Sequence, residues 1–225
     1  VTDDIKKTLA NANGGNDTLS VLGQMLTSSV RGGGGNDTLS LSLGNTTNNN
    51  AKGYVFGDAG DDSITVTASS GGATIYGDNT NGASGNDTLY IGAAITAIEL
   101  RANASDDWIT GIAAVVSTTL NAGAGNDTIQ ITGGDTSSFI ETVSGDNLIA
   151  QETYSSSLTF IGGTGSDSLT FAGSATGASV VGGSGMTQYH SSTLPQMVVH
   201  WLAPSTSVPA VVQILSTSTT AKQDR

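Results

Sequence analysis

The chain has no cysteine and only 7 lysine and arginine residues, against 19 aspartate and glutamate residues. Without cysteine there are neither disulfide bonds nor thiolate metal sites. The formal net charge of −12 argues against a nucleic-acid-binding protein, because phosphates need clustered basic side chains. It argues equally against binding to an anionic membrane surface. No apolar run approaches the roughly 20 residues of a membrane-spanning helix, so we expect no membrane insertion.

Aromatic residues make up 5% of the chain and there are three prolines, whereas 31 of the 225 residues are glycine. The glycines recur at fixed positions, which favours a structural repeat over low-complexity disorder. A small secreted domain without disulfides needs another stabilising cross-link, and a metal ion is the usual one. Val1 is not an initiator methionine and no signal-peptide pattern precedes it. We therefore expect the chain to be a processed product or a piece of a longer protein.

An aspartate recurs every 20 residues, or every 25 where a short insertion intervenes. A glycine stands two residues before it in nearly every copy, and an aliphatic residue stands two residues after it. A fixed period that keeps turn, acidic and apolar residues in register is typical of a solenoid. Asn147 takes the place of the acid in one copy. The repeated acids, called the motif aspartates below, are Asp17, Asp37, Asp62, Asp87, Asp107, Asp127 and Asp167.

Apolar residues alternate along the segment that follows each motif aspartate, and a second apolar position lies seven residues before it. Alternation at period 2 indicates strands with one buried face, so we predict two short strands in each repeat. A Gly-Asp turn closes one edge, and a Gly/Ala/Ser/Thr segment closes the other. Ile75 joins the second apolar row if an insertion lies in Asn79–Ala83. We predict an all-β fold: a right-handed parallel β-roll, or β-solenoid, with circuits of about 20 residues.

The composition changes after Gly185, where glycine disappears and all three prolines and both histidines are found. We divide the chain into β-roll repeats over residues 1–185 and a non-repeat C-terminal segment over residues 186–225. That segment is expected to cap the last circuit, or to serve assembly or secretion. Two candidate strands in it lie near Met197–Leu202 and Ala210–Leu215.

Stacked circuits would bring the motif aspartates into one column, with neighbours about 5 Å apart. Two like charges at that distance repel by about 3 kcal/mol at an effective dielectric constant of about 20. A divalent cation between successive carboxylates turns this repulsion into bridging, and the neighbouring glycines let backbone carbonyls approach the same point. An all-oxygen site with a flexible number of ligands suits Ca²⁺ better than Mg²⁺. Zinc is disfavoured because the repeat has no histidine or cysteine.

The repeat resembles the calcium-binding nonapeptide G-G-x-G-x-D-x-U-x of RTX proteins, the hemolysin-type repeat family. Gly32-Gly33-Gly34-Gly35-Asn36-Asp37-Thr38-Leu39 and Gly162-Gly163-Thr164-Gly165-Ser166-Asp167-Ser168-Leu169 match fully, and four further copies match in part. The resemblance implies a parallel β-roll that is secreted unfolded and folds on several external Ca²⁺ ions. It implies that the motif aspartates and the carbonyls of the glycine turns bind calcium. Those glycines are Gly15, Gly34, Gly35, Gly60, Gly85, Gly123, Gly125, Gly163 and Gly165.

The sequence departs from the family in three ways. The motif occurs once per circuit, so only one edge is expected to bind calcium. Ala104-Ser105-Asp106-Asp107-Trp108 lacks the glycines, and we expect Trp108 to point outward. Asn147 replaces the acid, and Asp146 is a candidate to substitute for it by a shift of one residue.

The composition is similar to that of bacterial surface-layer and RTX adhesin chains. We therefore expect a non-enzymatic, secreted protein of the bacterial cell surface: a surface layer, matrix fibre or adhesin that folds and self-assembles on Ca²⁺. Its expected partners are copies of itself, head to tail or side by side, with a cell-surface polysaccharide as a further candidate. The alternative is an accessory or secretion module of a secreted protease, lipase or epimerase. A catalytic domain upstream in the native gene would favour that alternative.

Overall fold

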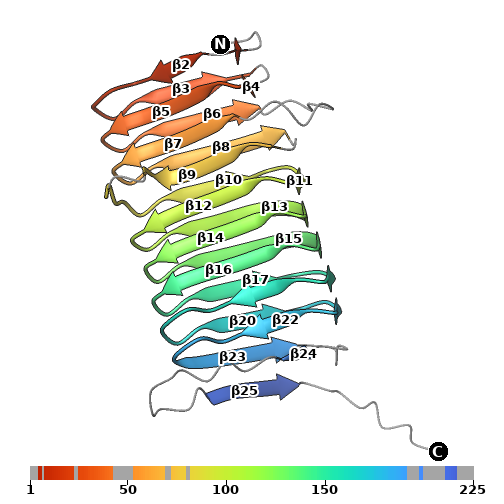
Figure 1. Cartoon of the computed structure of the whole chain (residues 1–225). Helices are drawn as coiled ribbons and strands as arrows, with labels where there is room; N and C mark the ends of the chain where they lie inside the picture. The colour runs from red at the N-terminus through yellow and green to blue at the C-terminus, as the bar shows by residue number, and fades with distance from the viewer. Residues whose placement is uncertain are drawn as a thin grey trace, which may run out of the picture.

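The computed structural model describes residues 5–6, 8–22, 25–42, 53–68, 72–79, 82–191, 198–199 and 211–216. These residues form strands, turns and bends, and no helix occurs among them. The strands stack into a rod with β2 (Leu9–Asn11) near one end and β25 (Val211–Ser216) at the other (Figure 1). The prediction of an all-β parallel solenoid is confirmed.

Two long parallel sheets run the length of the rod. The first has 13 strands: β3 (Thr18–Val21), β6 (Thr38–Ser42), β8 (Ser63–Ala68), β10 (Thr88–Ile91), β11 (Ile95–Thr96), β13 (Trp108–Val116), β15 (Thr128–Thr136), β17 (Leu148–Gln151), β18 (Ser155–Ser156), β20 (Ser168–Phe171), β21 (Ala175–Thr176), β23 (Met186–Ser191) and β25 (Val211–Ser216). The second has 10 strands: β2 (Leu9–Asn11), β5 (Ser29–Gly34), β7 (Tyr54–Ala59), β9 (Thr74–Asp78), β12 (Glu99–Ala104), β14 (Thr119–Ala124), β16 (Phe139–Ser144), β19 (Thr159–Ile161), β22 (Ser179–Val181) and β24 (Val198–Val199). A separate pair consists of β1 (Ile5–Lys6) and β4 (Met25–Leu26).

Each strand pairs in parallel with the equivalent strand of the next circuit. Leu39 of β6 pairs with Leu19 on one side and with Ile64 on the other. Ile75 pairs with Val55 and with Leu100, so its circuit carries the insertion after Asp78, where the sequence predicted it. Equivalent residues therefore stack along the rod, which is what the repeat period requires.

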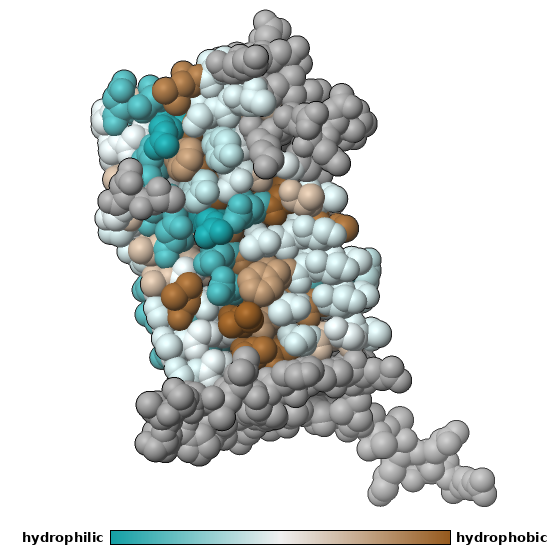
Figure 2. Space-filling view, viewed as in Figure 1, coloured by the Kyte–Doolittle hydropathy of each residue, from teal (hydrophilic) through white to brown (hydrophobic). Residues whose placement is uncertain are grey.

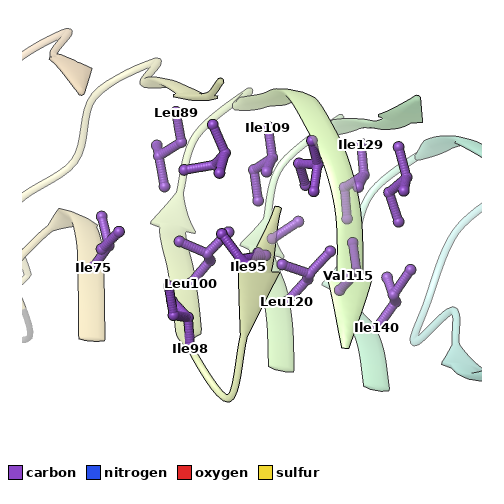
Figure 3. Close-up of a cluster of buried hydrophobic side chains, with 14 of the residues drawn as sticks. Ile75, Leu89, Ile95, Ile98, Leu100, Ile109, Val115, Leu120, Ile129 and Ile140 are labelled. Atoms are coloured by element: carbon purple, nitrogen blue, oxygen red, sulfur yellow. The ribbon is translucent and has the colours of Figure 1, made fainter. Parts of the chain in front are cut away.

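The core consists of aliphatic side chains that face each other across the rod. Leu89, Ile109 and Ile129 form a row that faces Leu100, Leu120 and Ile140, and all six side chains are fully buried (Figure 3). Both apolar positions of the repeat thus point inward as predicted. One circuit is too thin to bury this face by itself, so the core depends on stacking of neighbouring circuits.

A third side of each circuit was missing from the sequence-based prediction. Short strands such as β11, β18 and β21 follow the first strand of their circuits and pair with their counterparts in the next circuits. Ile95 and Val115 on this side are fully buried and appear beside Leu100 and Leu120 in the core (Figure 3). The prediction of two strands per circuit was incomplete, because small and polar residues surround these isolated inward positions.

Strands continue past Gly185. β23 pairs with β20, and β25 pairs with β23, while β24 pairs with β22. β24 and β25 lie where the sequence suggested the two C-terminal strands. Both histidines fall in this segment: the backbone of His190 belongs to β23, and His200 lies outside the described residues.

Candidate metal-binding column

The structure brings all the motif aspartates into one column inside the turn that joins the second sheet to the first. Their side chains point into the rod: Asp37, Asp62, Asp87, Asp107, Asp127 and Asp167 are 1–3% exposed, and Asn147 is equally buried. Each directly precedes a strand of the first sheet, since the next residue is the first residue of that strand. The alternation of the strand then buries the aspartate together with the aliphatic residue two positions later.

One oxygen of each motif carboxylate is used to join two circuits. The Oδ1 atom accepts the backbone N–H of the equivalent residue in the preceding circuit, and this repeats without interruption from Asp17 to Asp167. The N···O distances are 2.7 Å for Asp17 to Asp37 and 2.8 Å for Asp62 to Asp87. Asn147 keeps the pattern with its amide oxygen, which accepts the Asp127 N–H at 2.8 Å. We call this series the inner ladder.

The other oxygen of each motif carboxylate is buried without a hydrogen-bond partner among the residues that the structure describes. This holds for the Oδ2 atoms of Asp17, Asp37, Asp62, Asp87, Asp107, Asp127 and Asp167. A buried acceptor without a partner costs about 1–3 kcal/mol, and more when it is charged. Seven such atoms in one column are far more than chance omissions in a well-paired fold would leave.

The unpartnered oxygens lie against small residues of the second sheet. A Cβ placed on Gly32 would collide with Asp37 Oδ2 and would lie 2.6 Å from the Gly57 carbonyl oxygen, which belongs to the next circuit. The same two kinds of oxygen, a motif Oδ2 and a carbonyl of the next circuit, converge at Gly57 and Gly77. Two acceptors therefore face one another across a space that no side chain fills.

The circuit of Asn147 shows how this arrangement is completed without an ion. Its Nδ2 group donates to the Gly145 carbonyl at 3.0 Å. Thr142 stands where Gly32 and Gly57 stand in other circuits, and its hydroxyl donates to the Gly162 carbonyl at 2.8 Å. Asn147 thus has an N–H donor where the other circuits have the Oδ2 acceptor, and Thr142 has an O–H donor where the glycine circuits have no side chain. The aspartate circuits need a positive group from elsewhere.

Burial raises the pKa of the motif carboxylates of Asp62, Asp87, Asp107, Asp127 and Asp167. Desolvation is the main cause in each case, and it raises the pKa of Asp62 to about 7, of Asp87 to about 8 and of Asp107 to about 9. The pKa values of Asp127 and Asp167 rise to about 6 for the same reason. Neighbouring carboxylates add to the effect, while the inner-ladder N–H groups oppose it. A proton or a metal ion is therefore needed to hold this column together at neutral pH.

The turn glycines lie where the sequence placed them, next to the column. Gly15, Gly35, Gly60, Gly125 and Gly165 have φ between 110° and 146°, a region that favours glycine. The Gly34 and Gly163 carbonyls accept backbone N–H groups of neighbouring circuits, from Gly15 at 2.7 Å and Ser184 at 2.8 Å. A carbonyl oxygen has two lone pairs, so this use leaves one for a cation. Gly85 and Gly123 belong to the same turns.

A second ladder on the outside of the turn was not predicted. The residue before each motif aspartate uses its Oδ1 atom to accept the N–H of the equivalent residue in the next circuit, from Asn16 to Ser166. This outer ladder runs in the opposite direction to the inner ladder. Asp146 belongs to it and is exposed, so the idea that Asp146 shifts inward to replace Asn147 is wrong. The recurrence of Asn or Asp before the motif acid was the available signal.

Three further acids were missed because they lie outside the repeat. Asp58 forms an ion pair with Arg31, whose guanidinium also lies 4.0 Å from the Phe56 ring centre. Asp78 and Asp135 are fully buried, and each has one oxygen without a partner among the described residues. Asp135 lies on the third side of the rod, where Ser155 donates to its Oδ2 at 3.2 Å. Burial raises the pKa of this carboxyl as well.

The residues of the column fit a hard cation. The available atoms are all oxygens: one unpartnered carboxylate oxygen per circuit and a carbonyl of the next circuit at the same space. No group of three or more His, Cys, Asp or Glu side chains converges on one point within the described ranges. Carbonyls would therefore have to supply most of the ligands, as Ca²⁺ tolerates in its six to eight oxygen positions. The motif Oδ2 atom and a carbonyl of the next circuit come together at Gly32, Gly57, Gly77 and Gly162, where the absence of a Cβ gives the Oδ2 atom its room.

The outer surface is mixed in character. Figure 2 shows hydrophilic residues in a band that reaches from the N-terminal end to the middle of the visible face, and hydrophobic residues nearer the C-terminal end. Trp108 is 49% exposed, so the expectation that it points outward is confirmed. In the part of the chain that the structure describes, no helix is long and apolar enough to cross a membrane.

Comparison with protein-family models, with curated proteins and with solved structures found no match to this chain.

Proposed function

We propose that the chain is a calcium-dependent structural protein of the bacterial cell surface, such as part of a surface layer, a matrix fibre or an adhesin. The observation that carries this proposal is the column of seven buried Oδ2 atoms without hydrogen-bond partners. Carboxylates packed against carbonyls of the next circuit need a positive charge between them. Several Ca²⁺ ions, one per competent circuit, would supply that charge.

Calcium would act here as a staple between circuits. The motif Oδ2 atoms and the carbonyls of the next circuit would hold the ions, and each ion would neutralise charge that otherwise opposes stacking. Because the column exists only when the circuits are stacked, binding free energy becomes folding free energy. The chain would remain unfolded or loosely folded where calcium is scarce and become a rigid rod where calcium is abundant, as outside the cell.

The one-dimensional architecture also supports assembly from copies of the same chain. The order of strands in the second sheet ends at β2, and that of the first sheet ends at β3. A strand added beyond these would continue the same parallel pattern, and head-to-tail contacts of that kind build filaments. Lateral contacts are the other route to assembly, and cell-surface polysaccharide is a further candidate partner.

Calcium titration of the chain after chelator treatment tests the proposal. Far-UV circular dichroism is expected to show strand signal that rises with Ca²⁺ and saturates, with Mg²⁺ much less effective. Electron microscopy and light scattering of the same samples are expected to show ordered assemblies only with Ca²⁺. A chain that is fully folded and monomeric in chelator, and that does not bind Ca²⁺ in calorimetry, would overturn the proposal.

A further inference from the structure

Asp78 is a fully buried acid that does not belong to the motif series. It is the last residue of β9 and follows Gly77, one of the open glycines of the column. The ion pairs formed within the described ranges are Arg31 with Asp58 and Arg101 with Glu99. Asp78 therefore has no basic side chain to balance its charge in that part of the structure.

One side of the Asp78 carboxylate is held by the backbone. The Ala104 N–H donates to its Oδ2 atom at 3.3 Å, and the Gly85 N–H also hydrogen-bonds to the carboxylate. Its Oδ1 atom is buried and has no partner among the described residues. The carboxylate thus has the same arrangement as a motif aspartate, with one oxygen held by N–H groups and one left open.

Asp78 directly follows Gly77, a glycine that contacts the column. At Gly77, the Asp87 Oδ2 atom and the Ala102 carbonyl oxygen converge, the latter 2.9 Å from where a Cβ would lie. The charge of Asp78 raises the pKa of Asp87. It also contributes to the raised pKa values of Asp62 and Asp107. Negative charge is therefore concentrated around this circuit.

The neighbouring circuits do not repeat this feature. Asp58 pairs in register with Asp78, but the Arg31 guanidinium lies 2.6 Å from its Oδ1 atom and neutralises it. Gly33, Asn103 and Gly123 stand at the equivalent position in other circuits, where they add no charge. Asp78 is thus an uncompensated second acid at one step of the column.

We propose that Asp78 and Asp87 together form a two-carboxylate site for a hard divalent cation, and that it is the tightest site of the column. This inference rests on the proposed calcium function. Two carboxylates match the charge of a divalent ion, whereas each other circuit offers one carboxylate and neutral carbonyls. Affinity in oxygen sites rises with the number of charged ligands. The first ion bound would therefore fix the circuits around the Asn79–Ala83 insertion.

Isothermal titration calorimetry with Ca²⁺ on the full chain tests the inference through the variant Asp78→Asn. Asp61→Asn is the matched control, because it removes the same charge from an adjacent circuit at an exposed position. Asparagine occupies that position of the outer ladder at Asn36 and Asn86, so the control keeps the ladder intact. We expect Asp78→Asn to lose the tightest class of site, with a dissociation constant weakened by about tenfold or more. Asp61→Asn should keep this class of site, because the Asp61 charge acts on Asp87 less than the Asp78 charge does.

The outcomes are distinct. A parent chain that binds no Ca²⁺ overturns the proposed function itself. A parent chain that binds Ca²⁺ tightly while Asp78→Asn behaves like Asp61→Asn overturns the inference alone. A crystal of the parent chain grown with Tb³⁺ at one equivalent provides a readout that does not depend on the variant folding. An anomalous peak beside Asp78 and Asp87 is expected, and a first-occupied peak at another motif aspartate would contradict the inference.

Discussion

The Asn147 side chain donates its Nδ2 hydrogen to the Asp167 Oδ1 atom at 2.8 Å, as well as to the Gly145 carbonyl. Its own Oδ1 atom accepts the Asp127 N–H. One amide thus fulfils the connecting role of a motif aspartate and also provides a donor that an ionised carboxylate lacks. The comparison of asparagine with aspartate shows that the two oxygens of a motif carboxylate have different roles. The Oδ1 atom joins neighbouring circuits by a hydrogen bond, whereas the Oδ2 atom requires a positive partner.

Replacing Asp127 with asparagine is expected to make its circuit independent of metal. The amide oxygen would keep the inner-ladder hydrogen bond, and the amide nitrogen would donate as that of Asn147 does. In chelator at about pH 8 we expect the free energy of unfolding to rise by about 1–2 kcal/mol, and calorimetry with Ca²⁺ to show one site fewer. Asp106→Asn, on the outer ladder, is the control: it removes a charge that raises the pKa of Asp127 but keeps the Asp127 carboxylate, so the number of Ca²⁺ sites should not change. Loss of stability in Asp127→Asn would contradict the interpretation that the two oxygens have different roles.

The stability of the metal-free chain is expected to fall as the pH rises. Burial raises the pKa of Asp62 to about 7, of Asp87 to about 8 and of Asp107 to about 9. An unfolded aspartate releases its proton near pH 4, so between that value and about pH 9 the folded chain binds more protons than the unfolded chain. Stability therefore decreases with pH across this window.

Urea unfolding followed by circular dichroism, in chelator at about pH 5 and about pH 8, measures this effect. The midpoint is expected to be higher at the lower pH, and saturating Ca²⁺ should remove most of the difference. Identical urea midpoints in chelator at both pH values would show that ionisation of the column carboxylates does not lower the stability of the metal-free chain.

Removing the Thr142 hydroxyl is expected to destabilise the chain whether or not calcium is present. Thr142 is 1% exposed, and its hydroxyl donates to the Gly162 carbonyl at 2.8 Å. Thr142→Val keeps the shape and loses this donor, at a cost of about 1–2 kcal/mol. Thr142→Ser retains the hydroxyl and serves as the control. Thermal unfolding of both variants is measured with and without Ca²⁺. Recovery of the Thr142→Val stability on addition of Ca²⁺ would contradict the interpretation that this circuit binds no ion.

The outer ladder gives a prediction in which charge is irrelevant. The Asn36 Oδ1 atom accepts the Asp61 N–H at 3.1 Å, and Asn36 itself donates its N–H to Asn16. Asn36→Ala removes the acceptor and is expected to lower the free energy of unfolding by about 0.5–1.5 kcal/mol. Asn36→Asp keeps it, as Asp61 and Asp106 do elsewhere, and should cost much less. Equal losses in a urea titration would show that the ladder is not what stabilises this edge.

The repeat made the fold predictable because stacked circuits place equivalent residues in register. Leu39, Val55 and Ile75 were assigned inward from their spacing alone, and all three are fully buried. The third side of the rod escaped prediction, since its inward row does not continue the apolar character of Ile95 and Val115 in the next circuits. The inward row on this side becomes polar at Asp135 and Ser155, so it has no constant apolar position. Periodicity identifies rows of like residues and fails where a row changes its chemistry.

The sequence predicted that the motif aspartates form a column, but it did not predict the contacts of their individual oxygen atoms. The spacing identified Asp37 and Asp62 as equivalent, but it did not indicate that their Oδ1 atoms carry hydrogen bonds while their Oδ2 atoms have none. Asp78 carried no signal at all, because it does not stand at the repeated position of the motif aspartates. In the sequence, Asn147 is a position where the expected acid is missing. Only the structure shows that its amide group makes the hydrogen bonds of that circuit itself.

The sequence by itself determined the parallel solenoid, the inward rows and the stacking of the motif acids, because a repeat in a parallel coil maps period directly onto space. The tertiary structure alone decided which oxygen of each acid is free, and which other acids come close to the column. Those features depend on side-chain direction and burial between circuits, and contacts across circuits are not encoded in the spacing of any one repeat.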